Sequence, residues 1–511
     1  VCGGASAIVS GTWSATRKNE LGEWFSKTGV PFAATTTELV TSHVDGLAAR
    51  WVEVHTEVCE RGVRREQSDD LLDRRMLCLD QQLRNIDASM QVLERADAEI
   101  VERAFDVVLG LPRADECLRS FEAMPMVPPA AVAEDTQRMR SVLAEADALE
   151  RAGKWRESET LAREAVEHAR SIGWGPLEAE ALRSLGLATS RLLELEPATE
   201  LLTDSFFLAA ALGRHDLAAE TAEHLVRVMG VLARFEEALT WGRHAELAVE
   251  RAGDLEFQRA RLEDAVGVAL ARAGRFEEAA ARHTRAIAEA KRVLEPDDPR
   301  LCLMLSNSAQ PLTVLGRTEE ATQHLEHAVD LLEATVGPEH PRTASTLANL
   351  GIALKHAGRL EEALAAHQRA LAIWEHTVGP DNPHRLGTLS NLGITLSELG
   401  RYEEALLYHR EALTRTRTRS EPDPRLKSRV SNMGAILDQL GRKEEALALF
   451  EESLTLALEF FGPEHPETAV AHHNLGDTLG ELGRTEEGCE HLERAVELRL
   501  RLFGPDHGNT A

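Results

Sequence analysis

The side chains best suited to chemistry in this chain are six cysteines and 20 histidines. Two histidine pairs, His324 with His327 and His472 beside His473, could contribute metal ligands. Neither pair has a third ligand spaced nearby, and a zinc site takes at least three protein ligands. We therefore interpret these histidines as solvated or capping residues, and we expect no metal and no other cofactor.

Four of the cysteines, Cys2, Cys59, Cys78 and Cys117, fall in the first 120 or so residues. In a reducing compartment the last three would be small buried residues of a helical segment, and this is the interpretation that we favour. In an oxidising compartment the four would allow two disulfides in three connectivities. A cytoplasmic location is expected, and an extracytoplasmic one is the alternative.

Familiar catalytic motifs are absent from the sequence. A protein kinase needs a glycine-rich loop over the phosphates, an HRD-type catalytic loop and a DFG-type metal site, and none of these strings occurs. There is also no G-x-S-x-G elbow, no H-E-x-x-H and no CxxC pair. We expect that the chain is not an enzyme, and no catalytic residue is predicted.

The net charge of the chain limits the classes of partner that it can bind. A net charge of −28 repels nucleic acid and anionic membranes, because phosphate binding needs clustered Lys and Arg. The longest apolar run, 206–213, is far shorter than the roughly 20 residues that span a bilayer. Neither a membrane helix nor a signal peptide is predicted. The chain starts with Val and its last residues open a further repeat, which indicates a fragment of a longer polypeptide.

A recurring frame, Gly-Arg-x-Glu-Glu-Ala, organises the second half of the chain. Its steps are 42, 42, 42, 41 and 42 residues, and Gly488 replaces the Ala in the last copy. Its glycine stands at Gly274, Gly316, Gly358, Gly400, Gly441 and Gly483. Repetition at this period indicates stacked supersecondary units, hence a solenoid with a concave binding surface.

Each copy of the frame predicts a helix, a tight turn and an antiparallel helix. Gly358 supplies the positive φ that ends one helix, and Glu361 and Glu362 suit the positive end of the next helix dipole. Small residues at Gly351 and Ala363 let the two helices approach closely. Each unit restarts where a capping side chain precedes a proline: Asp298-Pro299, His340-Pro341, Asn382-Pro383, Asp423-Pro424 and His465-Pro466.

These motifs resemble the tetratricopeptide repeat, and the 42-residue copies with Val-Gly-Pro-Glu-His-Pro-x-Thr-Ala resemble its kinesin light chain type. Degenerate copies continue upstream, with turns near Gly153, Leu193 and Ala233, which makes nine turns in all. The resemblance implies an all-α, right-handed superhelical solenoid of helix-turn-helix repeats over residues 136–511.

The first 122 residues lack the frame, and a proline-rich linker, 123–135, follows them. Ser68 and the apolar spacing that follows it predict an amphipathic helix as far as Met90. Trp13, the strings 64–68 and 71–79, and Cys117 resemble the segment that joins kinase to repeats in bacterial, myxobacterial-type serine/threonine kinases fused to tetratricopeptide arrays. We expect this helical segment to cap the first repeats.

Carrying the repeat family's peptide-contacting asparagine onto this chain gives a row of candidate peptide-binding residues. An amide can both donate to and accept from a peptide backbone, whatever the peptide's sequence. The row is Asn307, Asn349, Asn391, Asn432 and Asn474, and Asn307 matches the motif least because Ser308-Ala309 follows it. The alternative is that these amides bridge neighbouring helices.

Neighbouring groove positions include Lys355, Glu398, Asp438, Asp477 and Glu481, and most are acidic. We expect Lys355, Asp438 and Asp477 to contact a neutral or basic extended segment, since capture of a terminal carboxylate needs several Lys or Arg.

The resemblances imply a non-catalytic protein interaction module, the sensor or substrate-recruiting part of a bacterial serine/threonine kinase, with no nucleic-acid partner. A free-standing scaffold or peptide-sensing regulator is the alternative. For the first, the family order also allows an extracytoplasmic position in a membrane-anchored kinase. Neither the partner nor the oligomeric state follows from the sequence.

Overall fold

The computed structural model describes residues 2–118, 126–253, 255–418 and 423–503. All regular elements in these ranges are helices, which confirms the all-α class. The chain divides into two compact units, Val1–Thr343 and Ala344–Ala511. Part of the predicted linker (123–125) and the start of a further repeat (504–511) lie outside the described residues.

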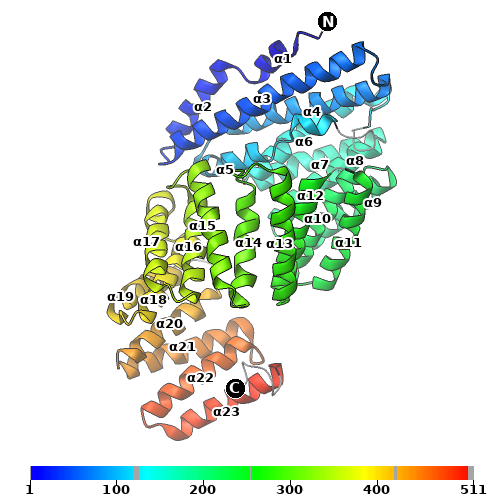
Figure 1. Ribbon diagram of the computed structural model, residues 1–511. Coiled ribbons are helices and arrows are strands. Elements are labelled where there is room, and N and C mark those ends of the chain that lie inside the picture. Colours follow the sequence, from blue (N-terminus) through cyan, green and yellow to red (C-terminus); the bar gives the residue numbers. More distant parts are fainter. Residues whose placement is uncertain (1, 119–125, 254, 419–422, 504–511) are drawn as a thin grey trace. The chain divides into compact units, whose positions relative to one another are not determined.

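The first unit begins with a segment of five helices, drawn in blue in Figure 1. They are α1 (Ala5–Thr12), α2 (Ala15–Lys27), α3 (Ala33–Val63), α4 (Asp69–Leu93) and α5 (Ala98–Leu109), followed by the 3-10 helix η1 (Ala114–Leu118). Ser68 accepts a hydrogen bond from the N–H of Leu71 at 3.2 Å, so α4 begins where the capping residue predicts.

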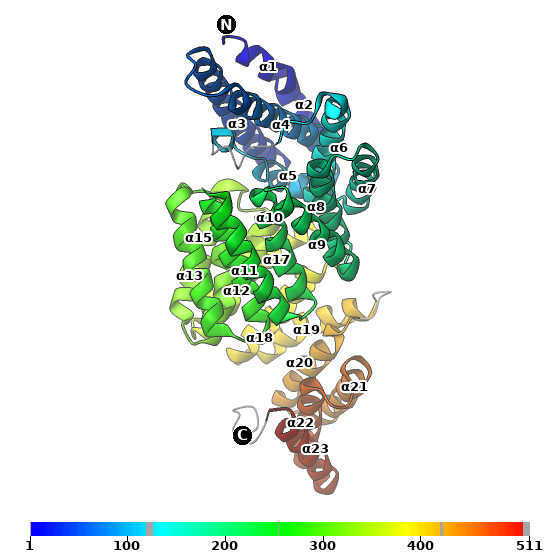
Figure 2. The same cartoon turned by 90° about the vertical axis from the view of Figure 1, so that its right-hand side faces the viewer.

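Helix pairs make up the rest of the first unit. After η3 (Ala130–Val132) come α6 (Ala133–Arg151), α7 (Trp155–Ile172), α8 (Gly175–Arg191), α9 (Leu195–Ala211), α10 (His215–Val231), α11 (Phe235–Ala252), α12 (Glu256–Arg272), α13 (Phe276–Val293), α14 (Leu301–Val314) and α15 (Thr318–Thr335). Figures 1 and 2 show them stacked side by side in antiparallel pairs.

The second unit continues the same pattern. Its helices are α16 (Pro341–His356), which starts just before the boundary, α17 (Leu360–Thr377), α18 (Pro383–Glu398), α19 (Tyr402–Arg417), α20 (Arg425–Gln439), α21 (Lys443–Phe461), α22 (Pro466–Glu481) and α23 (Thr485–Phe503). From α6 to α23 the described residues hold the nine helix pairs that the nine turns predict.

The turn frame behaves as its residues predict. Gly358 has φ +77°, and the degenerate copies place Leu193 (+63°) and Ala233 (+57°) in the same left-handed conformation. The Arg and the second Glu of the frame form an i,i+3 ion pair, such as Arg359 with Glu362 at 2.6 Å. This pair is exposed and adds little stability in water, so its main effect is to orient the first turn of the helix.

Three of the five predicted helix starts are confirmed, since α16, α18 and α22 begin at the proline itself, whereas α14 begins two residues after Pro299 and α20 one residue after Pro424. Asn382 accepts from the N–H of His384 at 2.9 Å, and His465 accepts from the N–H of Glu467 at 3.1 Å. The side chains of Asp298, His340 and Asp423 accept in the same way from the N–H two residues later. Each cap satisfies one of the backbone donors that a helix N-terminus leaves unpaired.

On α12, α16, α18 and α20 a glycine packs directly on a ring of the following helix. A Cβ added at Gly393 would lie 2.3 Å from the imidazole of His409, and one added at Gly351 would lie 2.5 Å from that of His367. Both rings are buried. The glycine is therefore required for helix contact rather than for backbone freedom, and the ring fills the space that the missing side chain leaves.

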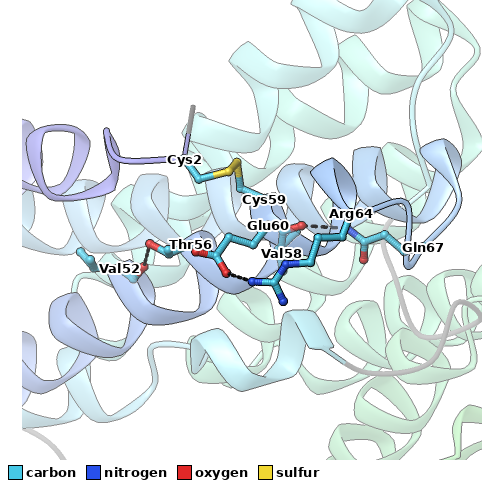
Figure 3. The surroundings of a disulfide bond; sticks show 8 residues. All are labelled: Cys2, Val52, Thr56, Val58, Cys59, Glu60, Arg64 and Gln67. Carbon is cyan, nitrogen blue, oxygen red and sulfur yellow. Dashed lines mark hydrogen bonds and ion pairs between the residues drawn. A yellow bond between two sulfur atoms is a disulfide. The ribbon is translucent and has the colours of Figure 1, made fainter.

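The cysteine interpretation that we favoured, buried free thiols, is wrong. Cys2 pairs with Cys59 and Cys78 pairs with Cys117, whereas Cys302 and Cys489 are free. Figure 3 shows the first disulfide where α3 ends, beside the hydrogen bond from Thr56 to the carbonyl of Val52 and the Glu60–Arg64 ion pair. The signal was present in the clustering of the four residues, but spacing alone could not choose among three connectivities.

The N-terminal segment packs on both ends of the first unit's repeats. One continuous apolar core joins it to Leu149 of α6 and to Leu294, Leu305 and Val336. His340 donates from Nε2 to the carbonyl of Glu102 at 3.2 Å. The segment therefore meets the first repeat, as a cap would, and also bonds with residues more than 230 positions later.

Candidate peptide-binding groove

Four of the five predicted asparagines stand at equivalent positions on α16, α18, α20 and α22. Asn349 is exposed, and Asn391, Asn432 and Asn474 are half-buried. The amides of Asn349, Asn391 and Asn432 make no hydrogen bond with any residue that the structure describes. Three amides of this row therefore keep their full donor and acceptor capacity.

The other two asparagines bridge neighbouring helices. Asn474 donates to the hydroxyl of Ser431 at 3.2 Å, and in the first unit Asn307 donates to both carboxylate oxygens of Asp264 at 3.1 Å. In each case the acceptor lies 43 residues earlier. The residue 43 before Asn391 is Ala348, which has no polar side chain to accept. Asn391 therefore lacks the kind of partner that Asn474 and Asn307 have.

The charged neighbours of the row are largely paired. Lys355 of α16 contacts Glu398 of α18 at 3.0 Å. Lys443 contacts Asp438 at 3.7 Å and also forms an ion pair with Glu481. The second unit's groove is thus less acidic than the predicted positions alone indicate, because Lys443 neutralises two of them.

Asp477 keeps the most accessible negative charge in the groove. It is exposed, and its described ion-pair partner is the imidazole of His473 at 3.4 Å. Lys443 was missed as a groove residue because it begins the second helix of its repeat, α21, and does not belong to a first helix. The signal was nonetheless present: Lys443 stands where the other copies of the frame have Phe276, Thr318, Leu360, Tyr402 and Thr485.

Asn307 belongs to a buried ionic network in the first unit. Its partner Asp264 is also 3.2 Å from Nδ1 of His283 and 3.5 Å from Arg227. Burial alone would raise the pKa of neighbouring Glu223, but the charges of Arg261 and Arg227 outweigh it and lower that pKa to about 2. An asparagine held in such a network stabilises helix contacts and has little capacity left for a ligand.

Two further searches cover the described part of the chain. Its helices include none that is both long and apolar enough to cross a bilayer. Within the same residues, Cys, His, Asp and Glu side chains form no group of three or more that could hold a metal ion. His324, one of the histidines considered for metal binding, has its Nδ1 2.7 Å from the hydroxyl of Ser308.

Comparison with protein families places repeats along the second half of the chain. Residues 300–375, 346–418 and 427–487 match one tetratricopeptide repeat family, and residues 264–300 and 468–509 match a second one. Among curated proteins none matches this chain.

Solved structures resemble parts of the chain at low identity. The apo form of RapI is 13% identical, with 71% of this chain and 98% of that chain covered and a TM-score of 0.52. Kinesin light chain TPR-like repeats of Podosopora anserina are 23% identical over 41% of this chain and 98% of theirs, with a TM-score of 0.37. BtubC (BKLC) from P. vanneervenii is 20% identical over 46% and 92%, also with a TM-score of 0.37. The likeness to RapI supports the solenoid fold.

Proposed function

We propose that the second unit binds an extended peptide segment across α16, α18, α20 and α22. The tetratricopeptide repeats matched over residues 264–418 and 427–509 are protein interaction modules, which supports this proposal. The observation that carries the proposal is the row of three amides with no bond to the described chain, Asn349, Asn391 and Asn432. A polar group half-buried and unpaired in the free protein gains a hydrogen bond when a peptide backbone arrives.

The charges of the groove select a neutral or weakly basic segment. Asp477 remains available for a Lys or Arg of the peptide, whereas Lys355 and Lys443 are occupied by their own ion pairs. An acidic segment would have to displace these pairs and would meet the net negative charge of the chain. The Asn474 amide joins the site only if its bond to Ser431 opens.

Replacing Asn391 and Asn432 together by Ala should weaken binding of a cognate peptide about tenfold to a hundredfold, because each lost hydrogen bond contributes on the order of 1 kcal/mol. Stability should barely change, since neither amide has a partner in the described chain. Fluorescence anisotropy of a labelled peptide and thermal melting, measured on the same double variant, check both statements.

The matched control is Asn307→Ala, which removes a bridging amide and leaves the Asp264 carboxylate with one partner fewer. It should lower the melting temperature and leave peptide affinity unchanged. The reverse pattern, with melting lowered in the Asn391/Asn432 variant and affinity retained, would show that the peptide binds elsewhere.

We further propose that the module regulates or recruits substrates for a serine/threonine kinase carried by the same polypeptide. The resemblance of residues 64–79, Trp13 and Cys117 to the segment between kinase and repeats supports this. A free-standing scaffold uses the same groove. Sequencing the gene on the 5′ side of this chain distinguishes the two: a kinase domain in the same reading frame supports the first, and a start codon at this point supports the second.

The two disulfides support an oxidising compartment, as in the extracytoplasmic alternative. Protein taken from its native compartment, unfolded without reductant and treated with iodoacetamide should gain two adducts, at Cys302 and Cys489, out of six cysteines. In the folded chain Cys489 should react first, because it is exposed whereas burial raises the pKa of the Cys302 thiol to about 12. Six adducts without reductant would place the chain in a reducing compartment.

A further inference from the structure

The first unit contains a cavity of about 810 Å³ that the proposed function does not use. Its floor is formed by the inner faces of α6, α8 and α10, and its walls by residues 109–116, by the start of α12 and by residues 293–300. The volume is that of a site for a small organic ligand or the end of a peptide.

Charged side chains on the floor are mostly satisfied by each other. Arg140 contacts Glu180 at 2.9 Å, and Arg183 contacts Asp147 at 2.8 Å. Burial would raise the pKa of Glu180, but the charges of Arg140 and Arg214 lower it below the usual range, so its carboxylate stays ionised. These pairs hold the floor rigid and nearly neutral.

Two arginines of the lining are different, Arg113 of residues 109–116 and Arg151 at the end of α6. The guanidinium groups of Arg113 and Arg151 form no ion pair or hydrogen bond within the described residues, although both face the cavity. The acidic side chains of the lining, in contrast, have partners: Asp115 contacts Arg50 at 2.5 Å and Glu220 contacts Arg183 at 3.5 Å. In addition, the buried Nε of Arg183 has no hydrogen-bond partner in the described chain. The cavity therefore has unpaired N–H donors and positive charges that no described carboxylate pairs with.

The segment that carries Arg113, residues 109–116, is fixed in place, and Arg151 of α6 packs against it. The Cys78–Cys117 disulfide ties η1 to α4, and Gln82 donates to the carbonyl of Arg113 at 2.7 Å. Arg151 lies directly over Gly110, where an added Cβ would be 2.4 Å from its Nε. The fixed backbone at Arg113 and the close packing of Arg151 reduce the conformational entropy that is lost when the two guanidinium groups form bidentate contacts.

Apolar side chains also line the cavity. Leu217, Leu255 and Leu294 are buried there, and the ring of Phe257 lies 4.6 Å below the guanidinium of Arg300. A ligand that fills the cavity thus meets both unpaired guanidinium groups and apolar side chains.

We propose that this cavity binds a carboxylate carried on a small apolar body, which is the chemistry shared by the C-terminus of a short peptide and by a free organic acid. The carboxylate pairs with Arg113 and Arg151, because the planar guanidinium matches its two oxygens. The apolar body lies against Leu255, Phe257 and Leu294. The site is separate from the peptide groove of the second unit and has the opposite charge preference.

Isothermal titration calorimetry of the full chain tests the proposal with four probes. N-acetyl-Leu-Phe with a free carboxylate should bind saturably, and its C-terminal amide should bind at least about tenfold more weakly, as expected for the loss of charge-assisted hydrogen bonds. The third and fourth probes are hexanoate and inorganic phosphate. Hexanoate binding as tightly as the dipeptide identifies a free organic acid as the source, whereas much tighter dipeptide binding identifies a peptide terminus.

The variants are Arg113→Gln and Arg151→Gln, each expected to weaken dipeptide binding about tenfold. Arg156→Gln is the matched control, because Arg156 is exposed on α7, lies outside the cavity lining and makes no described side-chain ion pair. Melting temperatures confirm that each variant is folded. The Asn391→Ala, Asn432→Ala double variant should bind the dipeptide normally, so that failure at one site is distinguished from failure at the other.

Three results would overturn the proposal: equal binding of the acid and the amide, unchanged binding in both arginine variants, or no saturable binding of either carboxylate at millimolar concentration. Phosphate that binds as tightly as the dipeptide would also overturn it, since an apolar body would then contribute nothing.

Discussion

Acidification from pH 6.5 to pH 4 should destabilise the unit Ala344–Ala511 steeply, because two of its buried histidines take up protons much more readily in the unfolded chain than in the folded one. His367 and His409 pack on Gly351 and Gly393, and both ring nitrogens of each lack a hydrogen-bond partner within the described residues. Burial, aided at His367 by the charge of Lys355, lowers the pKa of both from 6.5 to about 4.

The direction follows from proton linkage. Between pH 6.5 and pH 4 the unfolded chain binds more protons than the folded one, so the free energy of unfolding falls as the pH falls. The contribution of the neutral rings to the free energy of unfolding is fully present above pH 6.5. Roughly 3 kcal/mol of that free energy is lost for each histidine by pH 4. Urea denaturation followed by circular dichroism across this pH range measures the slope.

The chain supplies its own control variant. In the next repeat Phe450 occupies the position of His409 and packs on Gly434 in the same way. His409→Phe should therefore preserve packing, leave stability at pH 7 unchanged or higher, and remove about half of the histidine-dependent loss in acid. A pH slope identical to that of the parent chain would show that carboxylates and not these rings control acid unfolding.

Gly393→Ala should lower the free energy of unfolding by about 2 kcal/mol or more, because its new Cβ would lie 2.3 Å from the buried ring of His409. Gly387→Ala, on the same helix α18, should have the opposite effect. A Cβ at Gly387 meets nothing within 4 Å, so alanine adds about 0.5 to 1 kcal/mol by its better helix propensity.

The same urea titrations at pH 7 measure both variants. The comparison separates steric crowding from propensity, because the two residues share a helix and receive the same substitution. Similar shifts of the two midpoints, in either direction, would contradict the close contact between α18 and α19.

Local features of the fold could be predicted from the sequence because their causes are local. The positive φ at Gly358 and the cap at Asn382 depend on residues within one helical turn. Even the degenerate turn near Leu193 follows from the period of the repeat. The pairing of the cysteines could not be predicted from the sequence, because it depends on how α1, α3, α4 and η1 pack together.

The site was predictable only in part. The asparagine row follows from the repeat, but the motif does not show that Asn474 is occupied by Ser431 while Asn391, with Ala348 at the same offset, stays unpaired. The cavity of the first unit could not be predicted, since residues 109–116 and 293–300 meet there across almost 200 positions of sequence. This contact depends on the tertiary structure of the first unit, and no sequence motif predicts it.

The bond between Glu102 and His340 changes how the first unit must fold. In an ordinary solenoid every repeat touches only its neighbours, so folding can nucleate anywhere and repeats can fray from an end. Here the helical pairs from α6 to α15 lie within a loop that this contact closes, which raises the contact order and joins the repeats into one cooperative transition. The first unit therefore folds more slowly than a linear array of equal length, and its terminal repeats are protected from partial unfolding.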